Sequence, residues 1–195
     1  MTAPEGRLVV ATRNAHKLRE FERLLPGMDL EPLPAGIELP DETGDTFVAN
    51  ALIKARAAAA ATGRSAIGDD SGIESAALGG RPGVRSARFA GEDADDAANL
   101  AKLRELAPVG SPLRYVCALA YVSASGEEEV HLGECHGTLA AEPSGDHGFG
   151  YDPVFLPAAA DGSGRTMAEL TDVEKDAISH RGNAARRLLD SLSAG

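Results

Sequence analysis

The chain has 195 residues, of which 43% are hydrophobic, and this suits a single globular domain over residues 1–195. Its formal net charge is -11. A protein that holds DNA or RNA by its backbone shows a basic face or run, whereas the densest charge runs here are acidic. We therefore expect no nucleic-acid partner. A nucleotide is not excluded, because a few cations and a bound metal can reverse the local field.

The N-terminal segment lacks a charged stretch followed by an apolar one, so we expect no signal peptide. No apolar stretch reaches the ~20 residues that span a bilayer, and no membrane partner is expected. Cys117 and Cys135 lie in strand-like segments. Reduced, buried thiols are favoured over a disulfide or a metal site, and the compartment that follows is the cytoplasm.

Strand-like and helical segments alternate along the chain. The first half predicts a strand over 7–11, a helix over 17–25, an irregular or edge-strand segment over 30–40, a helix over about 47–61 that ends at Gly63, and a strand over 65–68. The second half predicts a helix over about 93–106, strands over 113–122 and 129–141, an irregular segment over 143–157, and a final helix from 171–175 through Arg187 and Leu192. This order predicts an α/β domain with a mixed sheet flanked by helices.

A polar stretch lies at the first strand-to-helix junction. Its residues are Thr12, Arg13, Asn14, Ala15, His16 and Lys17. Hydroxyl, amide and ammonium groups beside free helix N–H groups can cradle a triphosphate. A polar N-cap with a solvent-exposed lysine explains the same six residues equally well. No Walker A pattern occurs in the chain.

Two pairs of acids form a second candidate group. Asp41 and Glu42 lie in one loop, and Asp69 and Asp70 follow a strand. Mg²⁺ prefers oxygen ligands and is usually held by one or two carboxylates together with substrate phosphates. One aspartate can bind the metal while the other orients or deprotonates a water molecule. An Asx-turn is the simpler explanation of an isolated Asp-Asp, but the Ser71-Gly72 that follows favours a phosphate contact.

Two further motifs lie in the second half of the chain. In Gly148-Phe149-Gly150-Tyr151-Asp152-Pro153, two glycines allow close backbone approach while an aromatic ring covers a base. In Ser179-His180-Arg181-Gly182, with Lys175 before it, cations can pair with phosphate or base carbonyl groups. Taken alone, the first motif is more often a structural turn, and a single histidine such as His180 is more often structural than catalytic.

Together these motifs resemble the inosine triphosphate pyrophosphatase family, whose members are also called dITP/XTP pyrophosphatases or Ham1-like proteins. The resemblance runs from about Leu8 to Leu189 and rests on TRNAHK, ETG-TF-NA--KA, DDSG, GG-PG--SAR, GFGYDP and ISHRG, in this order. It implies an elongated α/β fold with a long mixed sheet, two lobes with a central substrate cleft, and a homodimer. It also implies hydrolysis of dITP, ITP and XTP between the α and β phosphates.

The resemblance assigns roles residue by residue. Asp70 matches the general base, and Asp41 or Glu42, with Asp70 and Asp69, matches the acids that bind Mg²⁺. The remaining matches are substrate contacts: Thr12, Asn14 and Lys17 for phosphate, Lys54 facing the phosphates, Ser71 beside the base, Phe149, Gly150, Tyr151 and Asp152 in the nucleobase loop, and Lys175, His180 and Arg181 for base recognition. The chain departs from the family at Arg13, where many members carry Gly, and at Asp41, where Glu is frequent.

The expected reaction is in-line attack of a water molecule on the α phosphorus, activated by Asp70. Donors at the 6-oxo group of hypoxanthine or xanthine would leave ATP a poor substrate. Two alternatives are weighed against this hypothesis. A regulatory module that binds nucleotides without hydrolysis would lose the acids, and all four are present. A Maf-like pyrophosphatase of modified pyrimidines would lack the GFGYDP and SHR motifs.

Overall fold

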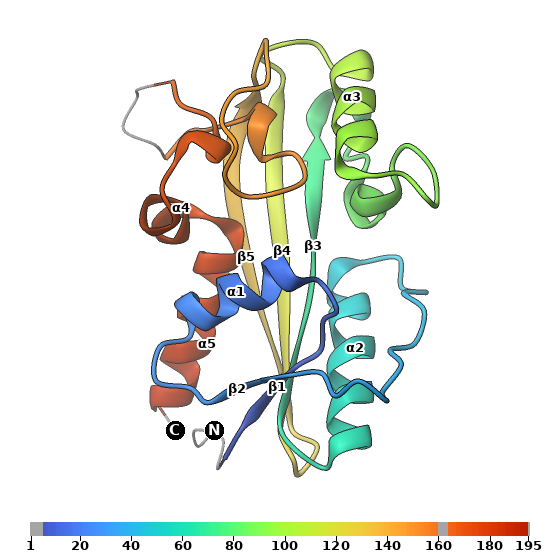
Figure 1. The fold of residues 1–195 in the computed structure, drawn as a ribbon, viewed down its shortest axis with the longest axis vertical. Helices are drawn as coiled ribbons and strands as arrows, with labels where there is room; N and C mark the ends of the chain where they lie inside the picture. Colours follow the sequence, from blue (N-terminus) through green and yellow to red (C-terminus); the bar gives the residue numbers. More distant parts are fainter. Residues whose placement is uncertain (1–5, 160–163, 195) are drawn as a thin grey trace. The chain divides into compact units, whose positions relative to one another are not determined.

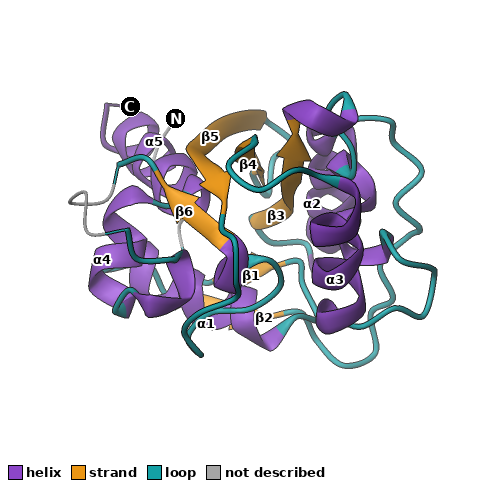
Figure 2. Ribbon diagram, turned by 90° about the horizontal axis from the view of Figure 1, so that it is seen from above, coloured by secondary structure: helices purple, strands orange, loops and turns teal. Residues whose placement is uncertain are grey.

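The computed structural model describes residues 6–159 and 164–194. Six strands form one sheet in the order β2-β1-β3-β4-β5-β6. Their bounds are β1 Leu8–Val10, β2 Leu30–Pro32, β3 Ala66–Ser75, β4 Pro112–Val122, β5 Glu128–Leu139 and β6 Phe155–Pro157. β1 pairs in parallel with β2 and β3, whereas β5 and β6 are antiparallel, so the sheet is mixed (Figure 2). The α/β class with a mixed sheet is therefore confirmed.

Five α-helices accompany the sheet within the described residues. Their bounds are α1 Ala15–Leu24, α2 Phe47–Thr62, α3 Asp96–Leu106, α4 Asp172–Ile178 and α5 His180–Ala194 (Figure 1). Within residues 6–159 and 164–194, no helix has the length and apolar character needed to cross a membrane.

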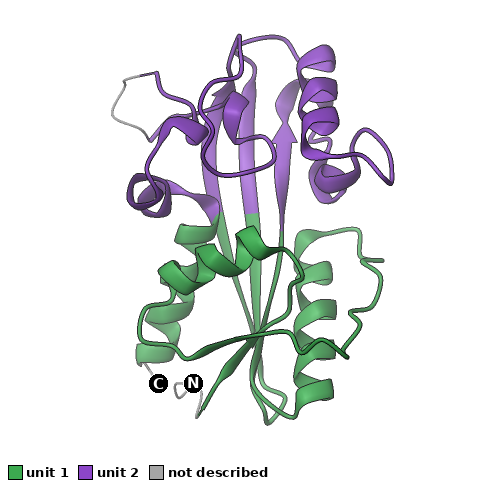
Figure 3. Cartoon of the chain, viewed as in Figure 1, with its two compact units in different colours: residues 1–70, 117–133, 181–195 green, residues 71–116, 134–180 purple. Residues whose placement is uncertain are grey.

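The chain divides into two compact units (Figure 3). Unit 1 comprises residues 1–70, 117–133 and 181–195, and unit 2 comprises residues 71–116 and 134–180. Strands β3, β4 and β5 each contribute residues to both units, so neither unit is continuous in sequence. The single domain and the substrate cleft expected from the sequence remain predictions.

In unit 1, adjacent residues of β3 face different helices. Ile67 belongs to the apolar core that α1 and α5 cover, with Phe21 and Leu188 among its members. Gly68 faces α2, where a Cβ atom would lie 2.4 Å from the carbonyl oxygen of Ala51. Because side chains alternate across a strand, α1 and α5 lie on one face of β3 and α2 lies on the other. This alternation also separates the two aspartates that follow.

Unit 2 has a core of its own. Residues from β3, β4 and β5 pack there with the segment before α4, and Ile73, Tyr115, Phe155 and Met167 are almost completely buried. The residues of the GFGYDP motif begin a short 3-10 helix, Asp152–Val154, that leads directly into β6. Tyr151 of this motif is itself part of the core.

Three expectations about the elements were wrong. β3 does not end at Gly68 but runs through the Asp-Asp-Ser-Gly motif to Ser75, so both aspartates lie inside a strand. The segment 143–157 contains β6, whose three residues pair with β5 and are too few to produce a periodic pattern. The final helix is interrupted at Ser179, whose backbone is extended, with ψ 154°. The other helices and strands lie within a few residues of their predicted bounds.

Candidate active site

The polar stretch after β1 forms the N-terminal turn of α1. Asn14 is the N-cap, and its side-chain oxygen accepts hydrogen bonds from the backbone N–H groups of His16 and Lys17 at 2.8 and 3.3 Å. The Thr12 hydroxyl accepts from the N–H of Asn14. Of the six residues, Lys17 projects to a second motif and forms an ion pair with Asp69 of β3. The helix N-terminus and this lysine thus lie on the same side of β1 and β3.

Arg13 is engaged with backbone. Its guanidinium donates to the carbonyl oxygens of Leu33, Pro34 and Ile37 at 2.8, 2.8 and 2.5 Å. Among the described residues only glycines have positive φ, so an arginine fits this loop without strain. A direct contact of Arg13 with substrate remains a prediction, and in this structure the side chain fixes the segment before the acidic loop.

Asp69 is the centre of a buried ionic network in unit 1. Its carboxylate pairs with Lys17 of α1, and with Nε of Arg181 at 3.4 Å. The thiol of Cys117 donates to it at 3.1 Å. Arg181, only 2% exposed, also pairs with Glu20 of α1 and lies over the ring of Phe21. Two carboxylates and two cations therefore link α1, β3 and α5 in the interior.

Asp70 points to the opposite face of β3, toward α2. Nδ2 of Asn50 donates to one carboxylate oxygen at 3.1 Å, and Nζ of Lys54 lies 3.4 Å from the other. Lys54 also donates to Glu42 at 2.6 Å, so one ammonium group bridges two carboxylates. Asp41 is exposed, and Glu42 is the acid of this loop that lies against Lys54.

The pKa values of the two neighbouring aspartates are shifted in opposite directions. Burial favours the neutral acid at both, but Lys17, Arg181 and Lys54 hold the pKa of Asp69 well below its ordinary value of 3.8. For Asp70 burial prevails: with the Glu42 carboxylate nearby, its pKa is raised despite Lys54 and Asn50. Asp70 is thus the better proton acceptor of the pair, and its role as the general base remains a prediction.

Asn50 is a site residue that the sequence analysis did not single out. It is 1% exposed, and its side-chain oxygen accepts from the N–H of Gly44 at 2.8 Å while its amide donates to Asp70. It therefore connects the acidic loop to the general-base candidate. Its position within the ETG-TF-NA--KA motif, one helical turn before Lys54, was the available signal.

In unit 2, Asp152 organises the predicted nucleobase loop. One of its carboxylate oxygens accepts from the N–H of Phe149 at 3.0 Å and from Nζ of Lys175 at 2.7 Å. The other accepts from the hydroxyl of Tyr115 at 3.0 Å. Lys175 also lies 5.3 Å from the centroid of the Phe149 ring, a cation–π contact. Three predicted base contacts, Phe149, Asp152 and Lys175, are thus connected to one another, and the sequence analysis did not single out Tyr115 of β4.

Glycine is required in the same loop. Gly148 has φ +73°, and a Cβ atom there would lie 2.1 Å from Oδ2 of Asp152. The N–H of Gly150 donates to the carboxylate of Asp96 on α3, and the hydroxyl of Tyr151 donates to the carbonyl of Ser86. The GFGYDP segment is therefore held from several elements of unit 2 rather than being an independent turn.

The consecutive residues His180 and Arg181 belong to different units. The His180 ring stacks on Tyr115 in unit 2, with centroids 4.6 Å apart and an interplanar angle of 8°. Arg181 enters the Asp69 network in unit 1. Ser71, half-buried, likewise begins unit 2 directly after Asp70. Base recognition by Arg181 remains a prediction, since its guanidinium here contacts Glu20 and Asp69.

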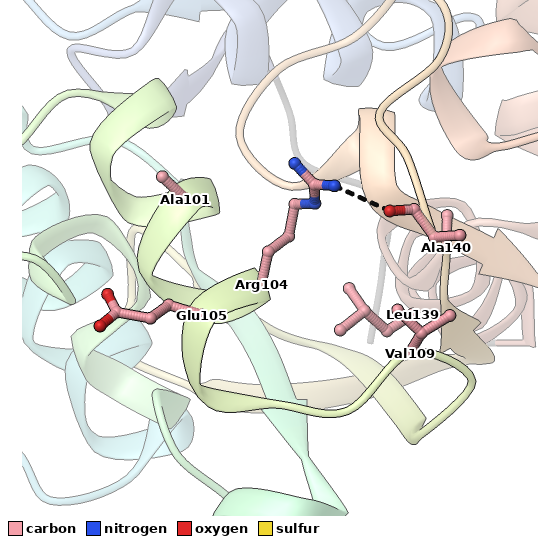
Figure 4. Close-up of a pocket in the computed structure, with 7 residues that line it drawn as sticks. Ala101, Arg104, Glu105, Val109, Leu139 and Ala140 are labelled. Atoms are coloured by element: carbon pink, nitrogen blue, oxygen red, sulfur yellow. Dashed lines mark hydrogen bonds between the residues drawn. The ribbon is translucent and has the colours of Figure 1, made fainter.

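In the described part of the chain no group of three or more His, Cys, Asp or Glu side chains is arranged to hold a metal ion. A pocket of about 330 Å³ in unit 2 lies between the end of α3 and the end of β5 (Figure 4). Arg104, Val109 and Leu139 are among its lining residues, and none of the predicted site residues lines it. Both cysteines are free and buried, as expected.

The comparisons with known proteins agree with one another. The model of the Ham1 family matches residues 8–191. The dITP/XTP pyrophosphatase of Mycolicibacterium paratuberculosis is 51% identical over 196 residues, covering 95% of each chain. A HAM1 protein from Coxiella burnetii has a similar structure, with a TM-score of 0.84 and 38% identity over 98% of this chain and all of the other. The Ham1 protein of Staphylococcus aureus gives a TM-score of 0.83 at 36% identity, over 97% and 99% of the two chains.

The Asp69 network predicts a pH-dependent cost of one substitution. Asp69→Asn leaves Lys17 and Arg181 without their shared carboxylate and should lower the free energy of unfolding by about 3–5 kcal/mol at neutral pH. Because the folded pKa of Asp69 lies below 3.8, its stabilisation is complete above that pH and declines as the pH falls further. Urea unfolding of the wild type and of Asp69→Asn should therefore show that the difference between their free energies of unfolding becomes smaller as the pH falls below 3.8.

The matched control is Asp29→Asn, which removes the exposed carboxylate that pairs with Arg7. An exposed pair contributes at most about 1 kcal/mol, so this variant should unfold almost as the wild type does. A cost at Asp69 no larger than that at Asp29 would contradict the network's role.

Proposed function

The chain belongs to the Ham1 family, and we propose that it hydrolyses dITP, ITP and XTP to the monophosphate and pyrophosphate, removing deaminated purines from the nucleotide pool. The observation that carries the proposal is Asp70, a buried carboxyl group with a raised pKa, oriented by Asn50 and Lys54. The similarity to proteins named dITP/XTP pyrophosphatase supports the choice of substrate.

Unit 1 contains the groups that we assign to phosphate binding. The N-terminal turn of α1 carries positive dipole charge, which favours a phosphate. Lys17 is in the first turn of this helix and Lys54 lies at Asp70, and each is paired with a carboxylate. These cations stabilise the pyrophosphate that leaves when the bond between the α and β phosphates breaks.

Asp70 acts as the general base in this proposal. The amide of Asn50 donates to one carboxylate oxygen of Asp70, so a neutral donor helps to orient this carboxylate. Asp70 accepts a proton from a water molecule that attacks the α phosphorus in line with the leaving pyrophosphate. Asp69 serves a different purpose, because its charge is compensated by Lys17 and Arg181.

We assign the metal site to Glu42 and Asp70. In this structure Nζ of Lys54 lies against both carboxylates, so these acids are positioned to share one cation. Two carboxylates, completed by substrate phosphates and water, are a usual ligand set for Mg²⁺. When bound, Mg²⁺ neutralises charge on the phosphate oxygens. Asp41, the acid named first from the sequence, is the weaker candidate because it is exposed.

Unit 2 supplies base recognition. Phe149 covers a base face, and Lys175, fixed by Asp152, offers a donor to the 6-oxo group of hypoxanthine or xanthine. The 6-amino group of adenine leaves that donor unpaired, which discriminates against ATP. The proposal includes a homodimer and a cytoplasmic location. The two free, buried thiols support the location, and the dimer rests on the family resemblance.

The substrate class predicts a specific pattern of pyrophosphate release. With Mg²⁺, dITP and XTP should be hydrolysed quickly and ATP slowly. The reason is that dITP and XTP carry an oxo group at position 6 of the purine, where ATP carries an amino group. Asp70→Asn keeps the size of the side chain but removes the base, and should lower kcat by about 10²–10⁴-fold. Equal turnover of ATP and dITP, or an active Asp70→Asn enzyme, would contradict the proposal. Binding of dITP without hydrolysis would indicate a regulatory module.

The metal assignment predicts a difference between two neighbouring acids. Glu42→Gln should raise the Mg²⁺ concentration for half-maximal activity at least about tenfold, because a carboxylate beside the cation site is lost. Asp41→Asn is the matched control and should change it little. Titration of Mg²⁺ at saturating dITP measures both. A larger effect at Asp41 would transfer the ligand role to that residue.

A further inference from the structure

Tyr115 lies at the centre of the base-recognition residues of unit 2 without belonging to any of the motifs. It is on β4, is 6% exposed, and belongs to the apolar core with Phe155 and Tyr151. Its ring is tilted against Phe155, with centroids 4.6 Å apart. A buried tyrosine in a strand ordinarily needs only a partner for its hydroxyl group. Here both the ring and the hydroxyl contact residues assigned to the base.

The hydroxyl of Tyr115 completes the environment of Asp152. Oδ2 of Asp152 accepts from the backbone of Phe149 and from Lys175, and the Tyr115 hydroxyl donates to Oδ1 at 3.0 Å. With both oxygens engaged and the side chain buried, the carboxylate has a defined orientation. The orientation of Asp152 in turn fixes the ammonium group of Lys175 and the backbone of the loop.

The ring of Tyr115 sets the plane of His180. The two rings are stacked with an interplanar angle of 8°, and both residues are nearly inaccessible to solvent. One side chain thus contacts two base-recognition residues from different elements, the nucleobase loop and the start of α5. Phenylalanine would keep the stacking and lose only the hydrogen bond, so the two contacts can be tested separately.

We propose that Tyr115 is a positioning residue for base specificity, which orients Asp152 through its hydroxyl and His180 through its ring. The inference rests on the proposed function and extends it to a strand residue that lies outside every motif. Tyr115 does not touch the reacting atoms. It acts through Asp152, Lys175 and His180. Its loss should therefore weaken recognition of the base and leave phosphate binding by unit 1 unaffected.

The test compares Tyr115→Phe with Tyr121→Phe. Tyr121 is on the same strand and is also buried, but its hydroxyl donates to Ser65 in unit 1 rather than to a base-recognition residue. Three quantities are measured for each enzyme: kcat and KM for dITP, the ratio of kcat/KM for dITP and ATP, and the inhibition constant of inorganic tripolyphosphate. The inhibition constant of tripolyphosphate reports on the phosphate-binding groups of the protein alone.

Loss of a hydrogen bond to the Asp152 carboxylate should raise KM for dITP about tenfold or more in Tyr115→Phe. Because base binding is lost equally from the ground and transition states, kcat should stay within about twofold. The preference for dITP over ATP should fall, and the tripolyphosphate constant should not change. Tyr121→Phe should match the wild type in all three. Tyr115→Leu, which also removes the stacking, should raise KM further.

Two results would overturn the inference: an unchanged KM in Tyr115→Phe, or a rise in the tripolyphosphate constant that parallels the rise in KM. The second would mean that the substitution disturbs the whole protein. Failure of the proposed function is distinguishable, because it would appear as a wild type that does not hydrolyse dITP. In that case the dissociation constant of dITP, measured by calorimetry, replaces KM in the same comparison, and an equal constant in Tyr115→Phe and wild type overturns the inference.

Discussion

The alternation of side chains along β3 is the constraint on which the site depends. Ile67 and Asp69 face α1 and α5, while Gly68 and Asp70 face α2. Two chemically identical neighbours are thereby placed in different surroundings. Asp69 meets two cations, and Asp70 meets an amide, one shared ammonium and a second carboxylate. One strand therefore provides, in two consecutive residues, the centre of an ionic network and the carboxylate that we propose as the proton acceptor.

Each helix of unit 1 contributes to this division. α1 supplies Lys17 and Glu20, α5 supplies Arg181, and α2 supplies Asn50 and Lys54. A buried ionic network of this kind adds little net stability relative to apolar packing, but breaking it is costly because uncompensated charge remains. Its effect is to fix α1 and α5 to β3, and with them the groups that we propose to bind the phosphates. In unit 2 a single carboxylate, Asp152, has the same organising effect on the nucleobase loop.

The sequence was informative where function depends on local motifs and uninformative where it depends on distant contacts. The polar stretch before α1, the Asp-Asp pair and the GFGYDP loop are local patterns that the sequence alone singled out, although the Asp-Asp pair lies inside β3 and not after a strand. Glu20 and Tyr115 belong to no local pattern. In the sequence Glu20 resembles a solvent-exposed helix charge, because its partner Arg181 is distant along the chain. Tyr115 resembles an ordinary strand aromatic, because its partner Asp152 is distant as well. The break at Ser179 was missed because neither Gly nor Pro marks it.

The account depends most on the opposite directions in which the pKa values of Asp69 and Asp70 are shifted, and carbon NMR of their side-chain carboxyl groups tests this directly. In metal-free protein labelled on aspartate, with assignment by Asp70→Asn and Asp69→Asn, the Asp70 signal should titrate above the ordinary value of 3.8. The Asp69 signal should show no titration down to the lowest pH at which the protein remains folded. Titration of Asp69 at or above 3.8, or of Asp70 below it, would contradict the account.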